Sequence, residues 1–250
     1  MRIRIGINGA CGRMGLRLVN LSYRQPDLQL TLAIEQPGHP AIGKDIALVA
    51  GLGLPSGILV ESGVNRKICD IILDFSTPQA TMTCVRQCKK YRIALLIGTT
   101  GLNREQAATI KAGSKKIPLL ISPNFSQGAS LLGKLGQELL RRLGKDADVE
   151  IVETHHRTKK DAPSGTALRL AQELKSASPA QGIAIHSLRL GEVIGEHKIV
   201  FGMPGERIEL THQVDTRDAF AYGALKMARI LAKKKPGFYT ITDILESARI

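Results

Sequence analysis

The first 35 residues constrain the fold more than any other part of the chain, because they place a glycine-rich turn and a helix between two apolar strands. Residues 3–7 predict the first strand and residues 28–34 the second. The turn occupies residues 9–15, and Leu18 and Leu21 follow with the spacing of a buried helical face. Strand, glycine turn, helix and strand in this order predict a parallel α/β unit that binds a dinucleotide.

The turn has the spacing G-x-x-G-x-x-G, with glycines at Gly9, Gly12 and Gly15, and Glu35 follows the second strand. In a dinucleotide-binding unit the glycines allow a tight turn and a close approach of the pyrophosphate to the helix N-terminus, and the acid binds a ribose hydroxyl. A glycine turn alone is not specific, since many such turns bind no nucleotide. The flanking strands and Glu35 favour a nicotinamide dinucleotide.

Three further apolar strands, at residues 68–75, 93–97 and 117–121, alternate with helices predicted at 78–89 and 103–113. Near-continuous apolar strands separated by helices predict a parallel, doubly wound, Rossmann-like sheet.

Small polar residues follow these strands at 76–78, 98–101 and 122–125. Ligands of doubly wound sheets bind beyond the carboxyl ends of the strands. We therefore expect these three turns to lie beside the glycine turn, with a nicotinamide or ribose contact at 98–100. The stretch 36–66 is rich in glycine and proline and predicts loops with a short edge element.

The second half of the chain has a different pattern. Helices are predicted at 129–143 and 164–176, with a strand between them, and antiparallel strands at 183–190, 195–203 and 206–214. A helix at 219–233 and a final segment at 239–248 are expected to pack against the first sheet.

We therefore expect two domains. Residues 1–126 and 213–250 would form the dinucleotide-binding domain, and residues 127–212 a substrate-binding and oligomerisation domain of the α+β class with an open mixed or antiparallel sheet. One face of an open sheet has to be covered, so contact between subunits through this sheet is expected.

Residues 153–167 (Glu-Thr-His-His-Arg-Thr-Lys-Lys-Asp-Ala-Pro-Ser-Gly-Thr-Ala) concentrate charge in a loop between a strand and a helix. In an extended segment His155 and His156 point to opposite sides, so they are not expected to share one role. Ser164 is suited to cap the following helix, which would leave the N–H groups of residues 165–167 for a carboxylate or phosphate. A solvated basic loop would explain the lysines, but not two adjacent histidines beside a capped turn.

The formal net charge of +13 has three explanations: nucleic-acid binding, acidic small-molecule ligands or a generally basic surface. The basic residues are spread along the chain, and aromatic residues make up 4% of it, too few to stack bases. We therefore expect anionic small molecules and no nucleic acid. The four cysteines lack the paired spacing of a zinc site and fit a reducing cytoplasm. Neither a membrane span nor a signal peptide is expected.

The stretch 153–167 resembles the hallmark segment of the dihydrodipicolinate reductase family, also called 4-hydroxy-tetrahydrodipicolinate reductases. The resemblance extends over nearly the whole chain, and the long motif is far more specific than the glycine turn. The other motifs that carry it are Gly9-x-x-Gly12-Arg13-Met14-Gly15, Asp74-Phe75, Gly98-Thr99-Thr100-Gly101, Pro123-Asn124-Phe125 and Gly195-Glu196-His197.

This resemblance implies an oxidoreductase of lysine and diaminopimelate biosynthesis that uses NADH or NADPH to reduce a cyclic, unsaturated imine dicarboxylate to tetrahydrodipicolinate, without a metal. It implies a homotetramer that associates through the C-terminal sheet. By position, His155 would be the acid/base residue and Lys159 the proton donor, and His156, Gly165 and Thr166 would hold the substrate carboxylates. The implied cofactor residues are Gly9, Ala10, Cys11, Gly12, Arg13, Met14, Glu35, Gly98, Thr99, Thr100, Ser122, Pro123, Asn124 and Phe125.

One departure from the family pattern concerns the cofactor. Many members carry an arginine directly after the ribose-binding acid, where it can pair with the 2′-phosphate of NADPH, and this chain has Gln36 there. NADH is therefore slightly favoured, although Arg13 or Lys44 could still bind a phosphate. Two rival functions are another Rossmann-fold reductase of a small acid and a non-catalytic NAD-binding regulator. Neither rival requires the loop with two histidines.

Overall fold

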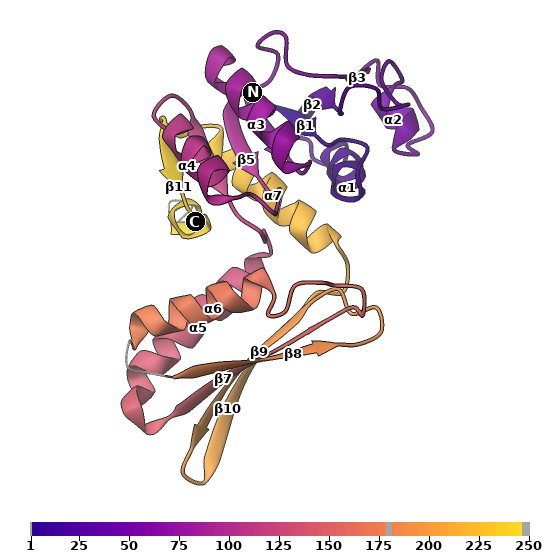
Figure 1. Ribbon diagram of the computed structural model, residues 1–250. Helices are drawn as coiled ribbons and strands as arrows, with labels where there is room; N and C mark the ends of the chain where they lie inside the picture. The colour runs from indigo at the N-terminus through magenta and orange to yellow at the C-terminus, as the bar shows by residue number, and fades with distance from the viewer. Residues whose placement is uncertain (1, 179–181, 247–250) are drawn as a thin grey trace. The chain divides into compact units, whose positions relative to one another are not determined.

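The computed structural model describes residues 2–178 and 182–246, and the chain divides into two compact units (Figure 1). Unit 1 combines the chain up to Phe125 with the chain from Phe220, and unit 2 is Ser126–Ala219. The first division lies within one residue of the expected boundary. The second lies after residue 219 rather than after residue 212, because the end of the last strand and the segment that follows it stay with unit 2.

Unit 1 contains a seven-stranded sheet in the order β11-β6-β5-β4-β1-β2-β3, in which all neighbouring strands are parallel. The strands are β1 (Ile3–Asn8), β2 (Leu28–Ile34), β3 (Val60–Glu61), β4 (Ile71–Asp74), β5 (Ala94–Ile97), β6 (Pro118–Ile121) and β11 (Gly237–Tyr239). This is the doubly wound parallel sheet that the alternation of apolar strands and helices predicts.

The helices of unit 1 are α1 (Arg13–Ser22), α2 (Ile46–Val49), α3 (Pro78–Tyr91), α4 (Arg104–Gly113), α7 (Asp218–Leu231) and α8 (Ile241–Glu246), of which α7 has its first two residues in unit 2. Thr77 caps α3, with Pro78 in its first turn, and Asn103 caps α4 through a reciprocal pair of bonds with Gln106. The short helix α2, capped by Asp45, lies in the stretch that the sequence predicts as loops. Residues 247 and 248 of the expected final segment lie outside the described residues.

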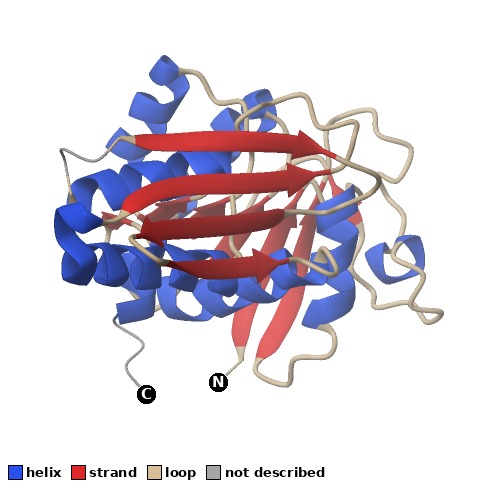
Figure 2. Ribbon diagram, turned by 90° about the horizontal axis from the view of Figure 1, so that it is seen from below, coloured by secondary structure: helices blue, strands red, loops and turns tan. Residues whose placement is uncertain are grey.

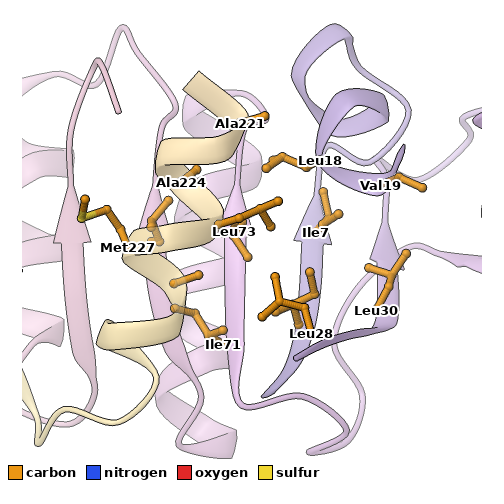
Figure 3. Packing of buried hydrophobic residues seen from close by; sticks show 14 of the residues in the cluster. Ile7, Leu18, Val19, Leu28, Leu30, Ile71, Leu73, Ala221, Ala224 and Met227 are labelled. Atoms are coloured by element: carbon orange, nitrogen blue, oxygen red, sulfur yellow. The ribbon is translucent and has the colours of Figure 1, made fainter. Parts of the chain in front are cut away.

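Both faces of the parallel sheet are buried under helices. Alternate residues of β4 point to opposite faces, so that Ile71 and Leu73 pack with α1 and α7, whereas Ile72 packs with α3 and α4. Figure 3 shows the first of these layers, in which α7 crosses the strands at Ala221, Ala224 and Met227. Burial of each large aliphatic side chain contributes roughly 1.5–3 kcal/mol to folding.

Unit 2 contains a second sheet in the order β10-β9-β7-β8. Its elements are α5 (Gln127–Leu143), a 3-10 turn η1 (Gly144–Asp146), β7 (Asp148–His155), α6 (Gly165–Ala177), β8 (Ile183–Arg189), β9 (Glu196–Met203) and β10 (Glu206–Gln213). The expectation that residues 183–190 are antiparallel is wrong, because β8 pairs with β7 in parallel. The cause is α6, which carries the chain back to the end of the sheet where β7 begins.

Helices α5 and α6 cover one face of the mixed sheet. The core beneath them contains Ile151 of β7, Ile199 and Phe201 of β9, Leu140 of α5 and Leu170 of α6. Figure 2 shows the other face, over which none of the described helices of unit 2 lies. The sheet is open, as the sequence predicts. In the described part of the chain, no helix is long and apolar enough to cross a membrane.

Candidate active site

The glycine turn of unit 1 brings the backbone close to itself at two of its three glycines. Gly9 has a φ of +76°, and a Cβ there would lie 2.6 Å from the carbonyl oxygen of Phe75. A Cβ on Gly15 would lie 2.1 Å from the carbonyl oxygen of Gly9. Helix α1 begins directly after Gly12, which has no side chain to cap it. The N-cap position therefore supplies no side chain to the positive end of α1.

Glu35 lies beside this turn, at the end of β2. Its carboxylate accepts hydrogen bonds from the N–H groups of Cys11, at 3.2 Å, and Gln36, at 3.0 Å. Glu35 and Gln36 also line a cavity of roughly 270 Å³, together with Gln79, Thr83 and other residues that follow β2 and β4. The acid thus stands between the glycine turn and a cavity at the carboxyl ends of the strands.

A buried carboxyl group fastens the ends of three strands around the turn. Asp74 of β4 is fully buried, and its Oδ1 accepts from Asn8 at 2.9 Å, Ser76 at 2.5 Å and Thr99 at 3.3 Å. Burial raises the pKa of Asp74, and these hydrogen bonds oppose the increase. Asp74 belongs to one of the sequence motifs, but the sequence alone predicts no role for it or for Asn8.

The remaining predicted cofactor residues differ in how they are exposed. Arg13, Thr100 and Pro123 are exposed, and Met14 is half-buried. The side chains of Ala10 and Phe125 belong to the core, so that only their backbone could meet a ligand.

The turn after β6 is stabilised by a hydrogen bond within the turn and by a ring contact with the turn after β4. Ser122 donates to the carbonyl oxygen of Asn124 at 2.7 Å, and the ring of Phe125 lies 5.7 Å from that of Phe75. A Cβ on Gly98 would lie 2.2 Å from the Phe75 ring, so this position requires glycine.

These residues of unit 1 fit a nicotinamide dinucleotide. The uncapped start of α1 suits a pyrophosphate, the carboxylate of Glu35 suits a ribose diol, and the adjacent cavity suits a planar base. The fit rests on backbone approaches at Gly9 and Gly15 that no other residue type would allow.

In unit 2, the predicted acid/base residue His155 is oriented by a carboxylate. His155 ends β7 and is 8% exposed, and its Nδ1 contacts Glu153, which is fully buried. Arg189 binds the same carboxylate with both terminal nitrogens, at 2.9 and 3.1 Å. The N–H of Ser164 donates to it at 3.1 Å. Burial alone would raise the pKa of Glu153, but Arg189, Ser187 and His155 lower it to about 2.

Two further histidines continue this polar face of the sheet. His197 of β9 is 2% exposed, lies edge-on to His155 with ring centroids 5.3 Å apart, and contacts the hydroxyl of Ser164 at 3.3 Å. His212 of β10 stacks on His197 with centroids 6.4 Å apart and contacts Ser126 at 3.0 Å. Burial lowers the pKa of His197 to about 3. The pKa of His155 is also lowered, mainly by burial and against the effect of Glu153.

The other predicted loop residues follow His155 directly. Lys159 donates to the carboxylate of Asp161 at 2.8 Å, and its side chain is 22% exposed. His156 is half-buried and contacts the hydroxyl of Thr158 at 2.8 Å. His155 and His156 differ in burial and in partners, in keeping with two roles.

Helix α6 begins at Gly165 and Thr166, so its positive end lies in the loop. Ser164 caps it as predicted, but the cap uses the N–H of Ala167, at 3.2 Å. The expectation that Ala167 would also be open to an anion is therefore wrong.

Each unit thus gathers its own predicted residues: the dinucleotide group in unit 1 and the histidine loop in unit 2. Sequence reasoning gave no role to Glu153, Arg189, His197 or His212. Glu153 and His197 belong to the motifs that carry the family resemblance. Arg189 could not be found, because its position opposite His155 follows from the parallel pairing of β7 with β8.

Comparisons with known proteins cover nearly all of the chain. Family models described as the N-terminus and the C-terminus of dihydrodipicolinate reductase match residues 3–125 and 128–245. A protein of Myxococcus xanthus named 4-hydroxy-tetrahydrodipicolinate reductase is 37% identical over 265 residues, with 97% of each chain covered. One of the same name from Anaeromyxobacter dehalogenans is 38% identical over 263 residues, again with 97% of each chain covered.

The fold also has a counterpart among solved structures. A dihydrodipicolinate reductase from Paenisporosarcina sp. TG-14 superposes with a TM-score of 0.77 at 26% identity, covering 96% of this chain and 98% of that one. An amine dehydrogenase from Mycobacterium smegmatis, at 12% identity, shares the fold alone, with a TM-score of 0.72. The chain therefore belongs to the family of dihydrodipicolinate reductases, the NAD(P)H-dependent 4-hydroxy-tetrahydrodipicolinate reductases of lysine and diaminopimelate biosynthesis.

Proposed function

We propose that the loop 155–166 of unit 2 binds and protonates the cyclic imine dicarboxylate that this family reduces. His156, Gly165 and Thr166 would hold its carboxylates, Lys159 would donate the proton and His155 would act as the acid/base residue. The observation that carries the proposal is the pairing of His155 with the buried Glu153 at the start of this loop. An imidazole held by a carboxylate has one fixed nitrogen and one that can exchange a proton.

The charge of the loop suits a dianionic ligand. Lys159 carries a positive charge, and the first turn of α6 at Gly165 and Thr166 adds the positive end of a helix. The solved relative from Paenisporosarcina is described as bound to dipicolinate, a planar ring with two carboxylates. We propose that this chain recognises the same pattern of two carboxylates on a six-membered ring.

Reduction of a conjugated imine needs a hydride and a proton. The nicotinamide supplies the hydride when it is bound. Lys159 is then the donor that neutralises negative charge on the substrate, since it is a cation on the loop that would bind the carboxylates. His155 would then restore the proton that Lys159 has given up, and would do so through Nε2, because Nδ1 is engaged by Glu153. Glu35 and the turn at Gly9 to Met14 would hold the cofactor, with further contacts from residues 98–100 and 122–125.

We propose that NADH is preferred over NADPH. The cavity beside Glu35 is lined by Gln36, Gln79 and Gln87, and in the described part of the chain neither lysine nor arginine lines it. A 2′-phosphate placed there would face the carboxylate of Glu35 without a cation to offset the repulsion. Support for this preference thus comes from Gln36, from the carboxylate of Glu35 and from the lack of lysine and arginine in the described lining.

Steady-state kinetics of NADH and NADPH oxidation in the presence of the imine dicarboxylate test this function and the preference together. We expect turnover with both cofactors and a higher kcat/KM for NADH. The Gln36→Arg variant should raise kcat/KM for NADPH about tenfold or more, which corresponds to one gained ion pair of about 1.4 kcal/mol. A native enzyme that strongly prefers NADPH would refute the argument from Gln36.

Two further properties of this chain are proposals. We propose a homotetramer that forms through the open face of the unit 2 sheet, because that face carries half-buried Val152 and Val200 and the 50%-exposed Leu188. We propose a cytoplasmic location, supported by Cys69, Cys84 and Cys88, which are buried as free thiols.

A further inference from the structure

Glu153 occupies a position where a charge is costly unless every contact is satisfied. It is fully buried, yet both of its oxygens are engaged, by His155, by the two terminal nitrogens of Arg189 and by the N–H of Ser164. The bidentate pairing with Arg189 keeps the carboxylate ionised. A carboxylate in this state can only accept hydrogen bonds, so the proton between Glu153 and His155 belongs to Nδ1 of the imidazole.

The other nitrogen of His155 faces a position without a side chain. Gly195 lies beside it, and a Cβ built there would be 3.2 Å from Nε2 and 3.6 Å from Cδ2. The backbone of Gly195 does not require glycine, because its φ lies outside the left-handed region. The absence of a side chain at Gly195 therefore leaves Nε2 uncovered on that side.

Arg189 joins this pair to the loop. Besides its two bonds to Glu153, it donates to the carbonyl oxygen of Asp161 at 2.5 Å. The carboxylate of Asp161 in turn accepts from Lys159 at 2.8 Å. One guanidinium thus connects the carboxylate that orients His155 to the residue that pairs with Lys159.

We propose that Glu153 and Arg189 are positioning residues for the reduction. Glu153 holds the Nδ1–H tautomer of His155, so that Nε2 exchanges the proton. Arg189 holds the segment around Asp161 and Lys159 in a fixed position relative to His155. Gly195 is the third part of this arrangement, since it leaves Nε2 accessible. The proposal rests on the role proposed above for His155.

The alternative is a purely structural ion pair that fastens β7 to β8 and to the start of α6. Such a pair would contribute to stability but would affect neither kcat nor the pH dependence of turnover. The two accounts therefore differ in measurements that do not depend on stability.

The first test reads the tautomer of His155 by ¹⁵N NMR of the full chain, assigned with the His155→Gln variant. In the native protein we expect neutral His155 to carry its proton on Nδ1. The variants are Glu153→Gln and the double variant Glu153→Gln/Arg189→Gln, which leaves no unpaired buried charge and so guards against misfolding. In both we expect a mixture of tautomers. A native Nε2–H tautomer, or an unchanged Nδ1–H tautomer in the folded double variant, would overturn the proposal.

The second test measures kcat, KM and the pH dependence of kcat for variants of Glu153 and Arg189. Glu153→Gln should lower kcat by roughly 10- to 100-fold, with a smaller change in KM, and should move the pH at which kcat is half-maximal. Arg189→Lys keeps the positive charge but loses the bidentate pairing of the guanidinium with Glu153. It should raise KM for the dicarboxylate several-fold, because the segment around Lys159 is then less well held. Values of kcat and KM within about twofold of native in both variants would leave the pair a structural role only.

Gly195→Ala tests the open side of Nε2. The added methyl group should lower kcat about tenfold or more while the Nδ1–H tautomer persists, because it crowds Nε2 and not Nδ1. The matched control is Gly182→Ala, at which an added Cβ has no neighbour within 4 Å among the residues that the structure describes. Equal kcat values for the two variants would mean that Nε2 does not exchange the proton.

These readouts separate the positioning claim from the function on which it rests. The tautomer is measured without substrate, so it tests Glu153 even if the chain does not reduce the imine dicarboxylate. If the tautomer depends on Glu153 but His155→Gln turns over at the native rate, the proposed role of His155 is wrong, and the claim that Nε2 exchanges the proton is overturned with it.

Discussion

His197 is a neutral imidazole in an enclosed part of unit 2, and its burial links the histidine row to the stability of the fold. Its pKa is about 3 in the folded chain, compared with an ordinary value of 6.5. Between these values the unfolded chain binds a proton that the folded chain does not. Stability is therefore complete above pH 6.5 and falls as the pH drops toward 3, by about 1.4 kcal/mol per pH unit for this one group.

Urea unfolding between pH 5 and 7 measures this effect. His197→Gln should reduce the dependence of the unfolding free energy on pH by close to one proton. His155 and His212 also have lowered pKa values, so part of the slope remains in the variant. The contribution of Glu153, whose pKa is about 2, lies below pH 4.5 and outside this window. Identical slopes in the native protein and His197→Gln would show that His197 is protonated in the fold.

At the level of single residues, the sequence predicted the loop groups for which we propose a role in the reaction, but not the buried groups that contact them. Two adjacent histidines, Lys159 and a capped turn are recognisable because such a cluster has no use in a core. Arg189 looks like an ordinary strand residue. Its contact with this site becomes visible only in the structure, where the parallel pairing of β7 with β8 places it opposite His155.

Among the elements, the glycine turn before α1 offers a comparison of two glycines with different constraints. A Cβ on Gly15 would meet the carbonyl oxygen of Gly9 at 2.1 Å, a backbone atom that cannot move without moving the turn. A Cβ on Gly12 would meet the same oxygen at 3.3 Å, and its φ of −76° is ordinary. We therefore expect a side chain at Gly15 to disturb the packing of the turn, and a side chain at Gly12 to disturb only the approach of a ligand.

Gly15→Ala should lower the free energy of unfolding by about 2 kcal/mol or more, because the added methyl forces α1 away from β1. Gly12→Ala should change it by less than about 1 kcal/mol and instead weaken dinucleotide binding at the start of α1. Thermal unfolding and calorimetric titration with NADH measure the two effects. A stable Gly15→Ala variant, or a Gly12→Ala variant with native affinity, would contradict this division of roles.

The elements also show where sequence reasoning succeeds and where it stops. Near-continuous apolar strands such as 94–97 predict the parallel sheet, because only a sheet covered on both faces needs them. β8 alternates between half-buried and exposed residues and gives no such signal. Its direction depends on the return of the chain through α6, so the antiparallel expectation failed there.

For the whole molecule, the open sheet of unit 2 is the feature that bears on assembly. Sedimentation of the native protein should give the mass of four chains of 27.0 kDa each. Val200→Lys places a long, charged side chain between Glu150 and Glu209 in the middle of the open face. It should produce smaller species, because the larger side chain would not fit against a second subunit and its ammonium would lose hydration on burial. A native monomer, or a tetramer that survives Val200→Lys, would mean that subunits do not meet through this face.

Turnover by the loop of unit 2 is the central claim for the whole molecule. The most direct measurement follows oxidation of the preferred nicotinamide cofactor with the imine dicarboxylate for the native protein, Lys159→Ala and the neighbouring control Lys160→Ala. We predict that Lys159→Ala lowers kcat by about 10²- to 10⁴-fold with cofactor affinity retained, and that Lys160→Ala remains near native. Native turnover by Lys159→Ala would contradict the assignment of proton transfer to this loop.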